Sequence, residues 1–364
     1  MFAYFAVTAV TGFFSGVSAA IANSPSGNRA GRGVNVQPSM GSRWTIFDVV
    51  ALATLISFSA FRFEVGTDYA VYALNYAQIQ PEFWDYYLER SALDWGYTQL
   101  TIALRTLSDF PYLIFWVTSA ITIVPVYLAI KKQSLNPALA LILYVLLAFY
   151  LAPMNAIRQG MAVGLNFWAS TFLEKRPWVF VALNIVASTL HLSAALAAVV
   201  QVVVKKWKPR TGGVLVALFT SLTFVLMMAF PPVRQFLASI IPRYELYLVP
   251  DAVGVGTYLA LIFKLGILLY ILHLLRNRPA EHIAMVAVGL VFLVVGTQYM
   301  VVARMEMYFG IFIVLALPNA LAQTRAVTDR GKSLHVAAVV ALAVAYFVAY
   351  LGNYAGLIPY KTYL

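Results

Sequence analysis

Three short segments combine an arginine with acidic or amide side chains, a set of groups that can bind a phosphate and accept a proton. The first, FRFEVGTDYAVY at residues 61–72, holds Arg62, Glu64 and Asp68, and Gly66 permits a tight turn between the two acids. Acids are ordinary in loops, and an arginine beside an apolar run can reach lipid headgroups. A surface role for this segment therefore stays open beside a role in binding or catalysis.

The second segment, PMNAIRQGMA at residues 153–162, places Arg158 and Gln159 in the first turn of a predicted helix that Asn155 can cap. Free backbone N–H groups and a guanidinium would then converge on one point, which is a ready anion site. A helix-end arginine can instead reach headgroups. We favour anion binding, because the positive end of a helix dipole is locally unfavourable for a cation.

The third segment, ARMEMYF at residues 303–309, holds Arg304, Glu306 and Tyr308 at the junction of two apolar runs. Ionisable residues embedded in apolar sequence are functional candidates, although Arg304 and Glu306 can also pair with each other or with other helices. His191, in the segment STLHLS, is either a hydrogen-bonded core residue or a group that titrates near neutral pH.

Aromatic residues crowd the stretch from 62 to 97, which also holds six of the chain's fourteen acids. They can form a belt at a membrane surface, or they can stack on the apolar C–H faces of sugar rings while the acids accept hydrogen bonds from hydroxyls. The aromatic residues are Tyr69, Tyr72, Tyr76, Phe83, Trp84, Tyr86, Tyr87, Trp95 and Tyr97.

The elements that must position these groups are membrane helices. The 364 residues are 62% hydrophobic and only 11% charged, and apolar runs long enough to cross a bilayer recur along the whole chain. The net charge of +11 lies in short clusters between those runs, which argues against nucleic-acid binding. The chain has no cysteine, and its four histidines have no metal-ligand spacing, so we expect neither disulfides nor a metal site.

Basic clusters set the expected topology, because they remain on the cytoplasmic side. The loop 23–44 carries Arg29, Arg32 and Arg43, whereas no Lys or Arg precedes the first run, so we expect the N-terminus outside. The sequence SAAIANS is similar to a signal-peptidase site, but the missing basic region before it predicts that the first helix is retained. Ten full spans are predicted, at 2–22, 45–61, 111–130, 137–152, 156–173, 213–230, 257–275, 283–300, 307–323 and 334–352.

The stretch 178–204 is the exception to this alternation. If this stretch crossed the membrane once, Lys205 and Lys206 would lie outside, and every later basic cluster would lie on the side opposite to the one expected. A re-entrant hairpin that turns near Leu190 and His191 keeps all basic clusters inside. The expected fold is therefore an all-α bundle in one membrane domain, residues 1–364, with large outer loops at 62–109 and 231–256.

The segments in this order resemble the EpsG-like branch of Wzy-type polysaccharide polymerases, over residues 61–364. The family usually has Glu-Pro-Gly-aromatic where this chain has Asp94, Trp95, Gly96 and Tyr97, so the carboxylate is one methylene shorter. The motifs that carry the resemblance are RFEVGTDYAVY, DWGY, AIRQGMA, ASTLHLSAAL, ARMEMYF and the C-terminal IPYKTYL.

The resemblance implies a glycosyltransferase of GT-C-like architecture in the bacterial cytoplasmic membrane, with its active site facing outward. Its substrates would be two polyprenyl-pyrophosphate-linked oligosaccharides, with no cofactor, and a chain-length-regulating membrane protein is a candidate partner. Arg158 and Arg304, supported by Arg62 or Arg243, are the expected pyrophosphate ligands. Asp68 is the expected base and His191 the second choice. The remaining expected substrate contacts are Glu64, Tyr69, Asp94, Tyr97, Gln159, Glu306 and Tyr308.

Three other functions stay open. An O-antigen ligase would use the same chemistry on a different acceptor. A flippase for lipid-linked oligosaccharides would need charges deep in the bundle, whereas these charges are expected at the outer side. A purely structural membrane partner would not need so many outward-facing arginines.

Overall fold

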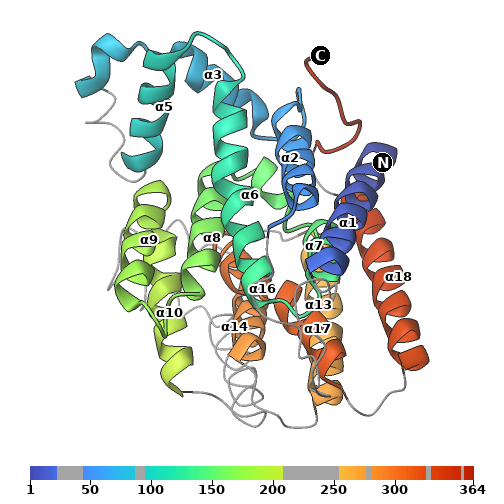
Figure 1. Cartoon of the computed structure of the whole chain (residues 1–364). Coiled ribbons are helices and arrows are strands. Elements are labelled where there is room, and N and C mark those ends of the chain that lie inside the picture. The colour runs from blue at the N-terminus through green and yellow to red at the C-terminus, as the bar shows by residue number, and fades with distance from the viewer. Residues whose placement is uncertain (23–43, 87–94, 208–253, 276–280, 325–328, 354–355) are drawn as a thin grey trace, which may run out of the picture. The chain divides into compact units, whose positions relative to one another are not determined.

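A computed structural model describes residues 1–22, 44–86, 95–207, 254–275, 281–324, 329–353 and 356–364 (Figure 1). These residues form helices joined by turns, with one isolated antiparallel β-bridge between Arg62 and Thr362 and no β-strand. The predicted all-helical fold is thus confirmed for this part of the chain. It divides into two compact units, Met1–Ala198 with Asp329–Leu364, and Val199–Thr328, which are described separately. The single membrane domain stays a prediction.

Within the described residues, five helical stretches are long and apolar enough to cross a membrane. They are Phe2–Ala22, Leu113–Gln133, Val255–Leu275, Glu306–Gln323 and Arg330–Gly352. A multi-pass membrane protein is therefore confirmed. The expected count of ten spans stays a prediction, because the loop 23–44, the span 213–230 and most of the loop 231–256 lie outside the described residues.

Helix α6 (Leu113–Gln133) lies at the centre of the first unit, where it packs against α2 (Ile46–Ala60) and α8 (Ile157–Ser170). Helix α1 (Phe2–Ala22) packs against α2 and against α7 (Pro137–Leu146), which also contacts α18 (Asp329–Asn353). Apolar side chains such as Phe115 on α6 and Phe167 on α8 are fully buried. Close packing of these side chains fixes α6 between its neighbours.

The span predicted at 137–152 is shorter than expected. Helix α7 ends at Leu146, and the chain then turns through Ala148, whose φ is +64°, to the 3₁₀ helix η2 (Ala152–Met154). A left-handed residue cannot continue an α-helix. The turn is buried, and internal hydrogen bonds, such as Tyr150 N–H to Tyr144 C=O at 3.1 Å, satisfy its backbone.

The expected outer loop 62–109 contains helices α3 (Tyr69–Gln78) and α5 (Trp95–Leu107) and the 3₁₀ helix η1 (Pro81–Phe83). Helix α3 buries Tyr69, Tyr72 and Tyr76, which share one helix face. The Tyr69 ring stacks on Phe115, with centroids 4.6 Å apart, and Tyr72 meets Tyr97 edge to face. These aromatics therefore attach α3 to α5 and α6, rather than forming an open platform.

Helices α9 (Pro177–Leu190) and α10 (Ser193–Trp207) are separated at the position predicted for the hairpin turn. His191 is extended, with φ −160° and ψ 117°. Its N–H donates to the Ala187 carbonyl at 2.9 Å, which is the last backbone hydrogen bond of α9. The predicted helical break is confirmed, whereas the return of the chain to the cytoplasmic side stays a prediction.

Cysteine labelling tests that return, because the chain has no native cysteine. If the hairpin is re-entrant, Lys206→Cys should be protected from a membrane-impermeant maleimide added to intact cells. Thr67→Cys is the control expected outside, and Lys175→Cys the control expected inside. Labelling of Lys206→Cys at the rate of Thr67→Cys would show that the stretch crosses the membrane.

The second unit is built on α13 (Val255–Leu275), which packs against α14 (Glu281–Gly296) and α17 (Ile313–Gln323). Helix α14 also packs against the short helices α15 (Met300–Ala303) and α16 (Glu306–Gly310). The junction between these two short helices carries the ARMEMYF segment.

Candidate functional site

The turn at Gly66 joins the first polar segment to the second. Gly66 has a φ of +100°, and a Cβ atom added to it would lie 2.5 Å from Asn155 Oδ1 and 3.0 Å from the carbonyl oxygen of Met154. The Thr67 N–H donates to Asn155 Oδ1 at 2.9 Å. Only glycine fits this turn, because both the backbone angle and the close approach exclude a side chain.

The expected capping role of Asn155 is wrong. The N-cap of α8 is Ala156, and it makes no side-chain cap hydrogen bond. Asn155 instead uses its side-chain oxygen to hold Thr67, which lies 88 residues earlier. The sequence could not show this contact, because an asparagine before a helix also suits a local cap.

Asp68 follows this turn as the N-cap residue of α3, but its side chain does not cap the helix. It is partly buried, and its Oδ1 accepts a hydrogen bond from the Thr67 hydroxyl at 3.2 Å. Its neighbour Tyr69 is buried on Phe115, and burial raises the pKa of the Tyr69 phenol to about 12. The structure therefore leaves the Asp68 carboxylate, rather than Tyr69, accessible beside the turn.

Arg62 is only 2% exposed. Its Nη1 donates to the Ser59 carbonyl at 2.5 Å and to the Ser59 hydroxyl at 3.1 Å, and its guanidinium lies 4.8 Å from the Phe115 ring centre. Its Nε is buried without a partner, beside a polar cavity with room for about one water molecule. Burial lowers the pKa of Arg62 to about 10, so the side chain stays charged at neutral pH.

Arg158 lies in the first turn of α8, partly buried, with its guanidinium 5.9 Å from the centre of the Tyr97 ring. Gln159, next to it, is buried. Tyr97 belongs to the DWGY segment, and burial raises the pKa of its phenol far above its usual value. The arginine of the AIRQGMA motif thus lies on the aromatic ring of the DWGY motif.

His191 is brought to the same region through α9. A Cβ atom added to Gly96 would lie 2.3 Å from Thr189 Oγ1, so the start of α5 touches the end of α9, two residues before His191. His191 is partly buried and caps the end of α9. The DWGY, AIRQGMA and STLHLS motifs therefore converge in the first unit.

The C-terminal segment, residues 356–364, covers the first polar segment. Phe63 N–H donates to the Lys361 carbonyl at 2.9 Å, and the exposed side chains of Lys361 and Glu64 form an ion pair of 2.9 Å. In Figure 1 the C-terminus, α3 and α5 lie at the same end of the first unit. Lys361 is a site neighbour that the sequence had not singled out.

In the second unit, Glu306 is buried and accepts a hydrogen bond from Lys264 on α13 at 2.7 Å. Tyr308 is fully buried, whereas Arg304 is exposed at the end of α15. The sequence left Glu306 to pair with Arg304 or with another helix, and the structure shows the pair with another helix. Lys264 was missed, although a single lysine inside a long apolar run was a signal for a buried partner.

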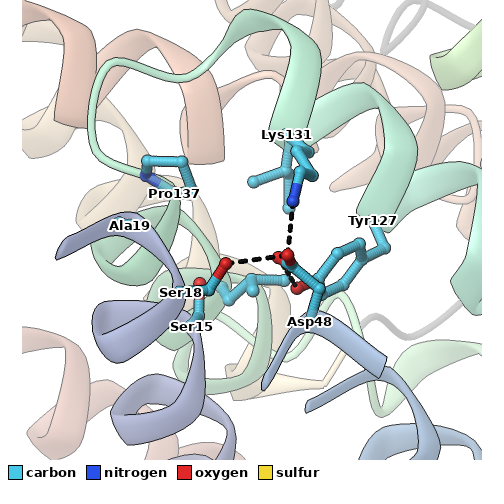
Figure 2. Close-up of a pocket in the computed structure, with 9 residues that line it drawn as sticks. Ser15, Ser18, Ala19, Asp48, Tyr127, Lys131 and Pro137 are labelled. Carbon is cyan, nitrogen blue, oxygen red and sulfur yellow. Dashed lines mark hydrogen bonds and ion pairs between the residues drawn. The ribbon is translucent and has the colours of Figure 1, made fainter. Parts of the chain in front are cut away.

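A second polar cluster, at the other end of α2 and α6, was also missed (Figure 2). Asp48 is 3% exposed and accepts hydrogen bonds from the Ser18 hydroxyl at 2.7 Å and the Tyr127 hydroxyl at 2.8 Å. It also forms an ion pair of 2.5 Å with Lys131. Lys131 and Phe115 are 16 residues apart on α6, or about 24 Å, so this cluster is remote from Arg62.

Asp94 and Arg243 lie outside the described residues. Among the residues that the structure places, no group of three or more His, Asp or Glu side chains could hold a metal ion.

Comparison with known proteins gives one match. The model of the EpsG family matches residues 45–362, which is most of the chain. No curated protein and no solved structure matches it. The matched range includes the polar segments at 61–72, 153–162 and 303–309.

Proposed function

Because the chain belongs to the EpsG family, which is associated with polysaccharide biosynthesis, we propose that it is a polysaccharide polymerase of the cytoplasmic membrane. It joins polyprenyl-pyrophosphate-linked oligosaccharide repeat units at the outer face, by glycosyl transfer that needs no metal. The growing glycan is transferred from its lipid carrier to the terminal sugar of a new lipid-linked unit.

The observation that carries this proposal is the convergence of motifs that are distant in the sequence. The Gly66 turn lies on Asn155, Arg158 lies on Tyr97, and Gly96 lies on Thr189. A bundle that only crossed the membrane would not require these contacts among polar segments. They bring the segments of Asp68, Arg158 and Tyr97 together in the first unit, which supports a shared site.

Arg158 is the proposed ligand of the leaving pyrophosphate. Its planar fork matches two phosphate oxygens, and the Tyr97 ring limits the positions that the guanidinium can take. Charge neutralisation in a site of low dielectric constant makes pyrophosphate a good leaving group. Arg62 is only 2% exposed, so its burial favours Arg158 as the direct ligand.

Asp68 is the proposed base. The acceptor hydroxyl oxygen attacks the anomeric carbon, the bond from that carbon to the pyrophosphate oxygen breaks, and the hydroxyl proton passes to the Asp68 carboxylate. Polyprenyl pyrophosphate leaves as the anion. Arg304, Glu306 and Arg243 remain proposed contacts for the lipid-linked substrates, and Asp94 a proposed contact for sugar hydroxyls.

The direct experiment uses the purified protein in a bilayer with one lipid-linked repeat unit. A ladder of lengthening products, resolved by electrophoresis or mass spectrometry, is the expected result. One transfer to a different lipid would identify a ligase. Transport of the substrate across the bilayer without new bonds would identify a flippase, and either result would overturn the proposal.

The choice of base gives a separate prediction. Asp68→Asn should leave folding and lipid-substrate binding intact but remove polymer growth, because an amide cannot accept the proton. His191→Gln should keep measurable turnover. Product length per unit of folded protein measures both effects. If His191→Gln is inactive and Asp68→Asn polymerises, His191 is the base and Asp68 binds a sugar hydroxyl.

A further inference from the structure

The C-terminal motif IPYKTYL takes no part in the chemistry proposed above, yet its segment contacts the loop that carries Asp68 along several residues. The backbone of residues 356–364 runs antiparallel along this loop. Gly66 N–H donates to the Gly356 carbonyl at 2.8 Å, and Tyr363 N–H donates to the Phe61 carbonyl at 3.3 Å. Between them lie the bond from Phe63 to Lys361 and the β-bridge from Arg62 to Thr362.

Aromatic contacts fix this segment to three helices. The Tyr363 ring stacks on Tyr112, with centroids 3.8 Å apart, and its hydroxyl accepts a hydrogen bond from Trp116 Nε1 at 2.8 Å. The Tyr360 ring stacks on Phe58 at 4.1 Å. The Tyr4 hydroxyl on α1 donates to the carbonyl of Leu357 at 2.6 Å. The segment is thus a rigid support rather than a free tail.

Gly356 is the point at which this support meets the turn. Its φ is +71°, and a Cβ atom added to it would lie 3.3 Å from the carbonyl carbon of Gly66 and 3.4 Å from Thr67 N. Asn155, at the end of η2, accepts a hydrogen bond from the same Thr67 N–H. The peptide between Gly66 and Thr67 is therefore in contact with two segments, and Asp68 follows it directly.

We infer that the C-terminal segment positions the base: through Gly356 it sets the place of the Gly66 turn, and with it the Asp68 carboxylate. This role rests on the proposed function of Asp68, whereas the contact between the segment and the turn does not. A displacement of about 1 Å of a reacting group can cost on the order of 100-fold in rate. Gly356 is a positioning residue, since it touches the turn and not the substrate.

The test compares Gly356→Ala with Gly352→Ala. Alanine is strained at the φ of Gly356 and presses on the turn, whereas a Cβ atom at Gly352 meets nothing within 4 Å. Gly356→Ala should lower the polymerisation rate per folded molecule at saturating substrate about 10-fold or more, with KM nearly unchanged, in addition to the lower thermal midpoint that a strained alanine causes. Gly352→Ala should match the wild type. A purely structural role would lower only the thermal midpoint and leave turnover per folded molecule unchanged.

A second measurement does not depend on catalysis: the rate at which a maleimide labels Thr67→Cys reports the conformation of the turn. Gly356→Ala should change its rate of maleimide labelling, and Gly352→Ala should not. Equal labelling and equal turnover in the two alanine variants would overturn the inference. If the wild type forms no polymer, the proposed function fails, and the labelling rate alone decides: a changed rate supports the positioning contact and an unchanged rate refutes it.

A second pair of variants tests the same inference if Gly356→Ala folds poorly. Tyr363→Ala removes the stack on Tyr112 and should reproduce both the loss of turnover and the change in labelling. Tyr363→Phe keeps the stack and should restore both. Wild-type turnover and labelling in Tyr363→Ala would show that the segment does not position the turn.

Discussion

Arg158→Lys should lose polymer formation by about 100-fold or more in kcat/KM, although the charge is kept. A lysine ammonium is a point charge that cannot make the two parallel hydrogen bonds of a guanidinium to a diphosphate, and it lies less well on the Tyr97 ring. The measurement is the rate of product-ladder formation per folded molecule, with the amount of folded protein taken from size-exclusion chromatography.

Arg105→Lys is the matched control. Arg105 also lies 5.9 Å from the centre of a tyrosine ring, that of Tyr76, and it belongs to α5 of the same unit. It has no proposed contact with substrate and pairs with the exposed Asp109 at 3.2 Å. Turnover should stay close to the wild type. Equal turnover in the two lysine variants would reduce Arg158 to a structural or headgroup contact.

The sequence was sufficient for those parts of the fold that depend on local pattern. Apolar run length predicted the membrane helices, and the break at His191 followed from the placement of Lys205 and Lys206. The end of α7 was not predictable, because Ala148 is a good helix former and adopts a positive φ only under tertiary constraint. Helix α3 was hidden in an expected loop, because its apolar face consists of tyrosines that also suit a membrane surface.

The candidate site was likewise predicted in part. Residue types and charge placement were enough to select Arg62, Asp68 and Arg158, and the structure brings their segments together in one unit. Arg62 is buried against the ring of Phe115 on another helix, and no local pattern encodes that contact. A single lysine in a long apolar run signals a buried partner but does not identify it, and Lys264 precedes its partner Glu306 by 42 residues.

The wider role of Asp48 could not be predicted from the sequence for a different reason, because a cap at the start of a helix already explains an acid at that position. Thr45 and Asp48 form a capping box at the start of α2, which accounts for an acid at that position. The same carboxylate also receives hydrogen bonds from α1 and α6, as Figure 2 shows. It therefore joins three helices through one buried group, and its removal should affect all of them.

Asp48→Asn should lower the free energy of unfolding by about 3–5 kcal/mol, because it leaves the buried ammonium of Lys131 without a counter-charge. The amide has nearly the size of the carboxylate, so the loss reports charge rather than packing. Thermal or denaturant unfolding of the purified protein in detergent, followed by circular dichroism, measures it. Lys132→Met, at the exposed neighbouring lysine, is the control: it loses hydrogen bonds to Thr171 but leaves no buried charge, so its loss should be about 1 kcal/mol or less. The double variant Asp48→Asn with Lys131→Met should recover much of the loss, since neither charge then remains buried. If Asp48→Asn alone unfolds like the wild type, the ion pair contributes nothing to holding α1, α2 and α6 together.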